Sequence, residues 1–186
     1  MQRVMIFGAS GAGKSTLARR LGQITGLPVV HIDPMYWKPG WVQREAGETT
    51  ALVRAAMAQD TWVFEGNHHA TFPERIARAD TVVFLDFPTW LRVWRVILRT
   101  WRSLGKTRPD MGEGCLERFD REFIFKWVAG YRRRSYARDI AILNKVPAHV
   151  KCHHLKSSTA VDRFCKKLSS SMNGGGYQGP WDYKES

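Results

Sequence analysis

One octapeptide near the N-terminus constrains this chain more than any other feature. Residues 8–15 read Gly-Ala-Ser-Gly-Ala-Gly-Lys-Ser, which matches the P-loop pattern of a glycine, four residues and then Gly-Lys-Ser. Glycines reach the positive φ angles that turn backbone N–H groups inward around a phosphate chain, and the next helix points its positive end at the same anion. The pattern predicts nucleotide-binding residues at Gly8, Ala9, Ser10, Gly11, Ala12, Gly13, Lys14, Ser15 and Thr16.

The flanks of this loop have the order that a P-loop requires. Residues 4–7 are an apolar run typical of a buried parallel strand. After the loop, Leu17, Ala18 and Leu21 suit one face of a short helix, which Gly26-Leu27-Pro28 ends. We therefore expect the chain to bind a nucleoside triphosphate, with Lys14 reaching its β- and γ-phosphates and Ser15 ligating Mg²⁺.

Size and composition are those of one globular α/β domain. The chain has 186 residues, of which 44% are hydrophobic and 25% charged. No apolar run approaches the roughly 20 residues that cross a bilayer, and the first strand begins too early for a signal peptide. The three cysteines, Cys115, Cys152 and Cys165, lack metal-ligand spacing and are expected to be reduced thiols. We expect a cytoplasmic protein without a membrane partner.

Strand and helix patterns alternate along the chain, which favours a mostly parallel sheet covered on both faces. The expected strands are 2–7, 29–32, 61–65, 81–86 and 148–155. The expected helices are 14–22, 47–59, 71–78, 89–104, 117–143 and 159–169. We expect one domain over 1–168 and a disordered tail over 169–186, where Ser and Gly dominate.

Polar side chains follow three of the expected strands, at the edge where open α/β sheets bind ligands. Asp33 is placed to orient or deprotonate an acceptor hydroxyl, to hold a water on Mg²⁺, or only to cap a turn before Pro34. Glu65 and Asp86 each end an apolar strand and compete for the acid that organises Mg²⁺. We favour Glu65, because its strand is expected beside the P-loop strand. His68 and His69 are equally compatible with substrate contact and with simple exposure.

The helix expected over 89–104 has two contrasting faces. At about 100° per residue its arginines fall on one side and its apolar residues on the other. We expect the apolar face to pack on the body and the arginines to project toward an anion. The arginine face holds Arg92, Arg95, Arg99 and Arg102; the apolar face holds Trp90, Trp94, Ile97, Leu98 and Trp101.

Positive charge gathers in the same part of the chain. The formal net charge is +12, and residues 87–145 hold 14 Lys/Arg against 6 Asp/Glu. A local surplus of this kind favours an anionic partner, either nucleic acid or a polyphosphate substrate. The arginines of 89–104 and those at 132–134 and 138 also suit a lid over about 89–143 that closes during phosphoryl transfer.

The motifs together resemble a family, the topology modulation or FlaR-like P-loop proteins, which are allied to adenylate kinases. The resemblance runs from Arg3 to about Leu168. Besides the P-loop it rests on Gly26-Leu27-Pro28, His31-Ile32-Asp33, Trp37-Lys38-Pro39-Gly40-Trp41, Glu65-Gly66-Asn67, Phe84-Leu85-Asp86-Phe87-Pro88 and the string from Lys106 to Cys115.

The resemblance implies a three-layer P-loop kinase fold: a five-stranded parallel sheet, an acceptor-binding insertion after the second strand and a helical lid after the fourth. It also implies ATP on the P-loop, Arg92 near the base or phosphates, and Asp33 and the aromatics after it facing an acceptor. The expected catalytic residues are Lys14, Asp33, Arg92, Arg95 and Arg99. The expected substrate-binding residues are Asp33, Trp37, Glu65, Asn67 and Arg108. The expected metal residues are Ser15, Glu65 and Asp86.

These expectations support a kinase that moves the γ-phosphate of Mg²⁺-ATP to a small acceptor, with a nucleoside monophosphate favoured. One alternative is a nucleic-acid-associated ATP-binding protein that influences DNA topology, motivated by the basic helices but lacking a recognition motif. Another is a nucleotide-binding regulator without catalysis. The sequence does not identify the acceptor or the oligomeric state.

Overall fold

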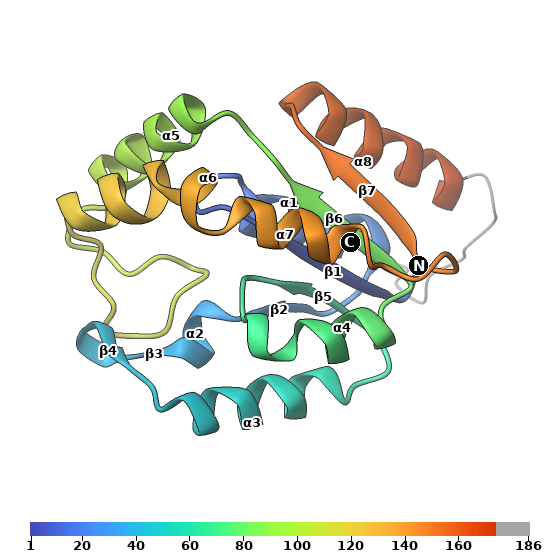
Figure 1. The fold of residues 1–186 in the computed structure, drawn as a ribbon, viewed down its shortest axis with the longest axis horizontal. Coiled ribbons are helices and arrows are strands. Elements are labelled where there is room, and N and C mark those ends of the chain that lie inside the picture. Colours follow the sequence, from blue (N-terminus) through green and yellow to red (C-terminus); the bar gives the residue numbers. More distant parts are fainter. Residues whose placement is uncertain (174–186) are drawn as a thin grey trace, which may run out of the picture.

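A five-stranded parallel sheet forms the centre of the protein, as expected (Figure 1). The computed structural model describes residues 1–173. The strand order is β2-β5-β1-β6-β7, so the P-loop strand lies in the middle with β5 and β6 on either side. The strands are β1 (Arg3–Gly8), β2 (Val29–His31), β5 (Trp62–Glu65), β6 (Thr81–Leu85) and β7 (Lys151–Leu155).

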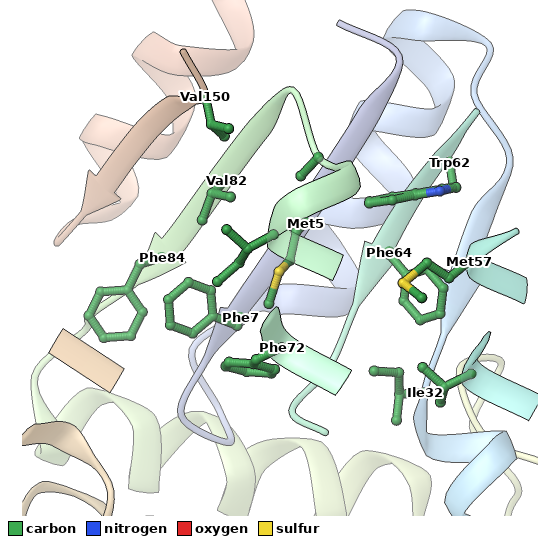
Figure 2. Close-up of a cluster of buried hydrophobic side chains, with 13 residues drawn as sticks. Met5, Phe7, Ile32, Met57, Trp62, Phe64, Phe72, Val82, Phe84 and Val150 are labelled. Carbon is green, nitrogen blue, oxygen red and sulfur yellow. The ribbon is translucent and has the colours of Figure 1, made fainter. Parts of the chain in front are cut away.

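Helices cover both faces of this sheet because β1 alternates its side chains between two cores. Val4 and Ile6 pack with α1 (Lys14–Thr25) and α8 (Ser158–Asn173). Met5 and Phe7 enter the second core, which Figure 2 shows. That core is closed by α3 (Ala46–Met57), α4 (Phe72–Arg78) and α7 (Tyr136–Leu143).

The last helix is longer than the sequence predicts. It continues through residues 169–173, which we had assigned to a disordered tail. The rest of that predicted tail lies outside the described residues.

Two inserted segments meet above the carboxyl edge of the sheet. The first follows β2 and contains α2 (Asp33–Tyr36) and an antiparallel hairpin of β3 (Trp37–Lys38) and β4 (Val42–Gln43), joined by the turn η1 (Pro39–Trp41). The second is residues 104–117, which we call the strap. Gly40 N–H donates to Gly114 O at 3.0 Å, and Trp41 Nε1 donates to Leu116 O at 2.7 Å. The hairpin and the strap are thus hydrogen-bonded to each other.

The helix α5 (Thr89–Ser103) has the opposite orientation to the expected one. Arg92, Val96 and Thr100 are buried, whereas Trp90, Trp94 and Trp101 face solvent. The inward face packs through Val96 on Ile124 and Val128. The prediction was wrong because the buried arginine finds enough hydrogen-bond acceptors inside the protein to replace water.

The single helix expected over 117–143 is divided into three pieces. A π-helical segment η3 (Phe123–Ala129) is followed by α6 (Tyr131–Arg134) and then α7. Ser135, with φ −125° and ψ −22°, separates α6 from α7. Asp86 at the end of β6 accepts hydrogen bonds from Arg132 on α6 and Tyr136 on α7.

A short 3₁₀ turn, η2 (His69–Thr71), links β5 to α4. No helix within residues 1–173 has the length and apolar character needed to span a membrane.

Replacing Phe64 by alanine should lower the free energy of unfolding by about 3–5 kcal/mol, because the ring is fully buried in the core of Figure 2 and its removal leaves a cavity. Phe125→Ala is the matched control, since that ring is 64% exposed, and it should change the value by less than about 0.5 kcal/mol. Urea unfolding followed by circular dichroism measures both. Equal effects of the two variants would contradict the assigned core.

Candidate functional site

A cleft of about 1470 Å³ opens at the carboxyl edge of the sheet. The P-loop forms its floor, α2 and the hairpin line one side, and α5, η3 and the strap line the other. This is the edge at which open parallel sheets bind ligands.

The P-loop of this cleft has the backbone that only glycine tolerates. Gly8, Gly11 and Gly13 have φ of 140°, 78° and 90°. A Cβ on Gly8 would lie 2.4 Å from Leu85 O, and one on Gly11 would lie 2.5 Å from Arg92 O. The loop therefore packs directly on the backbone of its neighbours and presents its N–H groups and the start of α1 to the cleft.

Asn67 holds the first glycine of the loop from the end of β5. Gly8 N–H donates to Asn67 Oδ1 at 3.2 Å, and Asn67 Nδ2 donates to Gly8 O at 2.9 Å. Buried Arg75 fixes the adjoining turn by donating to Gly66 O at 3.1 Å and His68 O at 3.2 Å. Asn67 lines the cleft, but its amide is used to position the P-loop, which differs from the substrate contact that we expected.

The hydroxyl of Ser15 lies between two carboxylates. Ser15 Oγ is 3.1 Å from Glu65 Oε1 and 2.9 Å from Asp110 Oδ2. A hydroxyl carries one proton, so it can donate to only one of the two carboxylates at a time. The contact between Ser15 Oγ and the other carboxylate oxygen then has no proton between its two atoms. That contact is favourable only when a further proton or a cation lies beside it. The arrangement matches Mg²⁺, which prefers oxygen ligands and takes one or two carboxylates beside substrate phosphates.

Asp110 is a site residue that sequence reasoning did not select. It lies within the string from Lys106 to Cys115 that carries part of the family resemblance, but only the folded strap brings it to Ser15. Within residues 1–173, no three His, Cys, Asp or Glu side chains are grouped as ligands of one metal ion. The set found here combines one hydroxyl with two carboxylates.

His31 is a second residue that the sequence analysis passed over. Its Nδ1 lies 2.6 Å from Glu65 Oε1 across the pair of strands β2 and β5. The hydrogen bond to Glu65 raises the pKa of His31 above its usual value, against an opposing effect of burial. Protonated His31 thus donates to the same carboxylate oxygen that contacts Ser15.

Asp33 begins α2 and lines the cleft, as its position after β2 predicts. Burial raises the pKa of its carboxyl, and the nearby charges of Glu65 and Asp110 act in the same direction. Lys14 and Arg108 oppose this shift. A carboxylate whose pKa is raised is a better proton acceptor than an exposed aspartate.

Asp86 does not lie at the P-loop serine, although its strand ends in the stronger sequence pattern. Its carboxylate accepts hydrogen bonds from Arg132, Tyr136 and His154, at 2.9, 3.1 and 3.0 Å. β6 ends between β1 and β7, so Asp86 ties α6 and α7 to the sheet. The expected metal role of Asp86 therefore has no support in the contacts, whereas Glu65 contacts Ser15.

Two of the three expected catalytic arginines of α5 line the cleft. Arg95 stacks over Phe87 at 4.5 Å, and its Nη1 is 3.9 Å from the place of a Cβ on Gly13. Arg99 lies against Glu117 at 3.3 Å, and burial lowers its pKa. Both guanidinium groups are placed to receive anions entering the cleft.

Arg92, in contrast, is an interior residue. It donates to Phe87 O at 3.1 Å, Val128 O at 2.9 Å and Thr89 Oγ1 at 3.0 Å, and its guanidinium stacks over Tyr131. These contacts join α5 to η3 and leave the group outside the cleft lining, so the expected contact with base or phosphates is not formed.

The side of the cleft formed by the hairpin and the strap is aromatic with one paired arginine. Trp37 packs edge-on against Tyr36 at 5.1 Å and Trp41 at 5.6 Å. Arg108 of the strap donates to Asp110 at 3.1 Å and to Glu117 at 2.8 Å, so its charge is balanced in this state.

The two histidines after Asn67 have separate surroundings. His68 contacts Thr71 at 3.1 Å, and His69 Nε2 contacts buried Asp139 at 2.9 Å. Both line the cleft, and His69 is tied to α7 rather than freely exposed.

Titration of His31 should give a pKa above the ordinary value of about 6.5, because Glu65 accepts its proton. The contribution of this pair to stability is then complete below pH 6.5 and is lost as pH rises through the higher folded-state pKa. The Cε1–H resonance of His31 measures the midpoint by NMR. Glu65→Gln should move that midpoint downward, and an unchanged midpoint would contradict the assigned pair.

Solved structures share this fold over nearly the whole chain. A shikimate kinase from Acinetobacter baumannii in complex with shikimate has a TM-score of 0.59 and 16% identity, over 94% of this chain and 95% of that one. A gluconokinase from Sinorhizobium meliloti 1021 has a TM-score of 0.52 and 13% identity, over 93% and 92%. A shikimate kinase from Aquifex aeolicus vf5 has a TM-score of 0.50 and 15% identity, over 94% and 99%.

No family model matches the chain, and no curated protein sequence matches it. The resemblance to the topology modulation proteins therefore stays a prediction, whereas the three-layer fold with a parallel five-stranded sheet is confirmed. The chain has the fold of small P-loop kinases.

Proposed function

We propose that this protein is a kinase that transfers the γ-phosphate of Mg²⁺-ATP to a hydroxyl or phosphate group of a small acceptor. The observation that carries the proposal is the position of Ser15 between Glu65 and Asp110. This serine lies at the end of the glycine-rich P-loop, which forms the floor of a large cleft. The loop offers inward N–H groups for phosphates, and Lys14 begins the helix behind them.

The bound Mg²⁺ would be held at Ser15, with Glu65 and Asp110 beside it, and it supplies positive charge to the phosphates. Lys14, Arg95 and Arg99 would neutralise the charge that spreads over the moving phosphoryl group. Water exclusion would come from the strap and hairpin, which already contact each other over the cleft.

Where the acceptor group is a hydroxyl, Asp33 would take its proton; a phosphate acceptor is largely ionised at neutral pH and needs no base. As the acceptor oxygen bonds to the γ-phosphorus, the bond from that phosphorus to the bridging oxygen breaks, ADP leaves, and the hydroxyl proton passes to the Asp33 carboxylate. The raised pKa of Asp33 supports this role, and it implies that activity falls on the acid side as the carboxylate becomes protonated.

A nucleoside monophosphate is our favoured acceptor, because the aromatic group of Tyr36, Trp37 and Trp41 offers flat faces for a base. The shared fold of a shikimate kinase and a gluconokinase adds small hydroxy acids as the second acceptor class. Arginines at the cleft suit the anionic group that either class carries.

Consumption of ATP in the presence of Mg²⁺ should depend on one class of small acceptor and yield its phosphorylated product. The panel contains nucleoside monophosphates, small hydroxy acids, sugars and duplex DNA, and phosphorus NMR identifies the product. Lys14→Ala is the blank and should lower turnover by about 10²-fold or more, because a positioned donor to the transferring group is lost. Stimulation by DNA alone, or unchanged turnover of Lys14→Ala, would contradict the proposed kinase.

Asp110→Asn should raise the Mg²⁺ concentration needed for nucleotide binding by about tenfold, because a carboxylate beside the metal is lost. A fluorescent ATP analogue titrated with Mg²⁺, without acceptor, measures the effect independently of turnover. Glu113→Gln is the matched control, an exposed carboxylate on the same strap, and should bind like the wild type. Equal Mg²⁺ dependence of both variants would exclude Asp110 from the metal site.

A further inference from the structure

The outer face of α5 carries three exposed tryptophans that the proposed kinase reaction does not use. Trp90, Trp94 and Trp101 are 71%, 54% and 76% exposed. Arg95 and Arg99, on a different side of the helix, line the cleft. In Figure 1, α5 lies at the edge of the molecule, away from α3. An exposed row of large aromatic side chains marks an interaction surface more often than a solvated one.

The three indoles can contact one flat surface together. At about 100° per residue they lie within about 40° of one another around the helix axis. At about 1.5 Å per residue they span about 16 Å along it. Because the helix is continuous from Thr89 to Ser103, the row is straight and convex rather than grooved.

The border of this row is positively charged. From Phe87 to Pro109 the sequence contains no Asp or Glu, while Arg102 and Lys106 are exposed there. In the strap, Asp110 and Glu117 are buried and paired with Arg108, and Glu113 is the one exposed acid, so Arg102 and Lys106 have no acidic partner among the described residues. The partner that complements this border is therefore anionic.

A second copy of the chain does not meet this requirement. Each copy carries a formal net charge of +12, and pairing the two rows would bring their cationic borders together. Single-stranded nucleic acid is anionic, but its usual sites are grooves in which bases stack on aromatics. Here the row is convex, and exposed aliphatic side chains, Leu104 at 57% and Leu116 at 52%, follow it in the strap.

We propose that the outer face of α5 binds the surface of an anionic phospholipid bilayer. Tryptophan concentrates at the boundary between headgroups and acyl chains, where its apolar ring and polar N–H are both accommodated. Arg102 and Lys106 pair with the lipid phosphates at the border of the row. Binding of this kind leaves the cleft open, because the tryptophans and the cleft lining lie on different sides of α5.

Vesicle flotation tests this surface on the full chain without nucleotide. The protein should float with phosphatidylcholine vesicles that contain phosphatidylglycerol, remain unbound with phosphatidylcholine alone, and dissociate as salt rises. The triple variant Trp90→Ala/Trp94→Ala/Trp101→Ala should bind anionic vesicles about tenfold or more weakly, because the inserted apolar area is lost. Leu52→Ala, which removes an exposed apolar side chain on α3, should bind like the wild type.

The charge variant Arg102→Glu/Lys106→Glu provides an independent check and should lose the preference for anionic vesicles. All substitutions are at exposed positions, and circular dichroism before flotation confirms that each variant is folded. Equal binding of the triple variant and the wild type would overturn the proposal. A wild-type dimer that the triple variant abolishes would instead assign the face to a second copy. Binding of single-stranded oligonucleotide, but not of vesicles, through the tryptophans would assign it to nucleic acid.

Discussion

The contact of one serine hydroxyl with two carboxylates organises the cleft. Ser15 lies in the first turn of α1, Glu65 ends β5, and Asp110 belongs to the strap, so three distant parts of the chain meet at one oxygen. One hydroxyl proton cannot satisfy both carboxylates, and His31 and Arg108 supply part of the missing positive charge. We propose that a divalent cation with nucleotide phosphates binds beside these oxygens, which are the ligand type that Mg²⁺ prefers.

Two other buried carboxylates, those of Asp86 and Asp139, hold the helices that cover this cleft in place. Asp86 binds Arg132, Tyr136 and His154, and Asp139 binds His69 and Tyr131. These carboxylates join the segment after the strap to the sheet and to the turn after β5. Buried acids of this type are stable only when they are paired, so the positions of α6 and α7 are fixed by their partners. The carboxylates at the ends of β5 and β6, the two strands that flank β1, thus have separate roles, one at the P-loop and one at the covering helices.

The parts of the fold that depend on local pattern could be predicted from the sequence. The P-loop, the parallel strands and the place of the Glu65 strand beside the P-loop strand followed from residue spacing and strand order. The orientation of α5 could not be predicted, because its periodicity shows two contrasting faces but not which of them packs on the rest of the protein. Arg92 is stable inside because the backbone oxygens of Phe87 and Val128 accept its hydrogen bonds. The roles of Asn67 and Asp110 depend on contacts between residues far apart in the chain, which spacing does not reveal.

The proposed kinase reaction requires that the P-loop cleft hold Mg²⁺-ATP at Ser15. A crystal structure of the protein with Mg²⁺ and a non-hydrolysable ATP analogue tests it most directly. We expect the analogue's phosphates against the N–H groups of residues 8–15 and metal density beside Ser15 Oγ, on the side of Glu65 and Asp110. Metal at Asp86, or phosphates bound away from the P-loop, would contradict it.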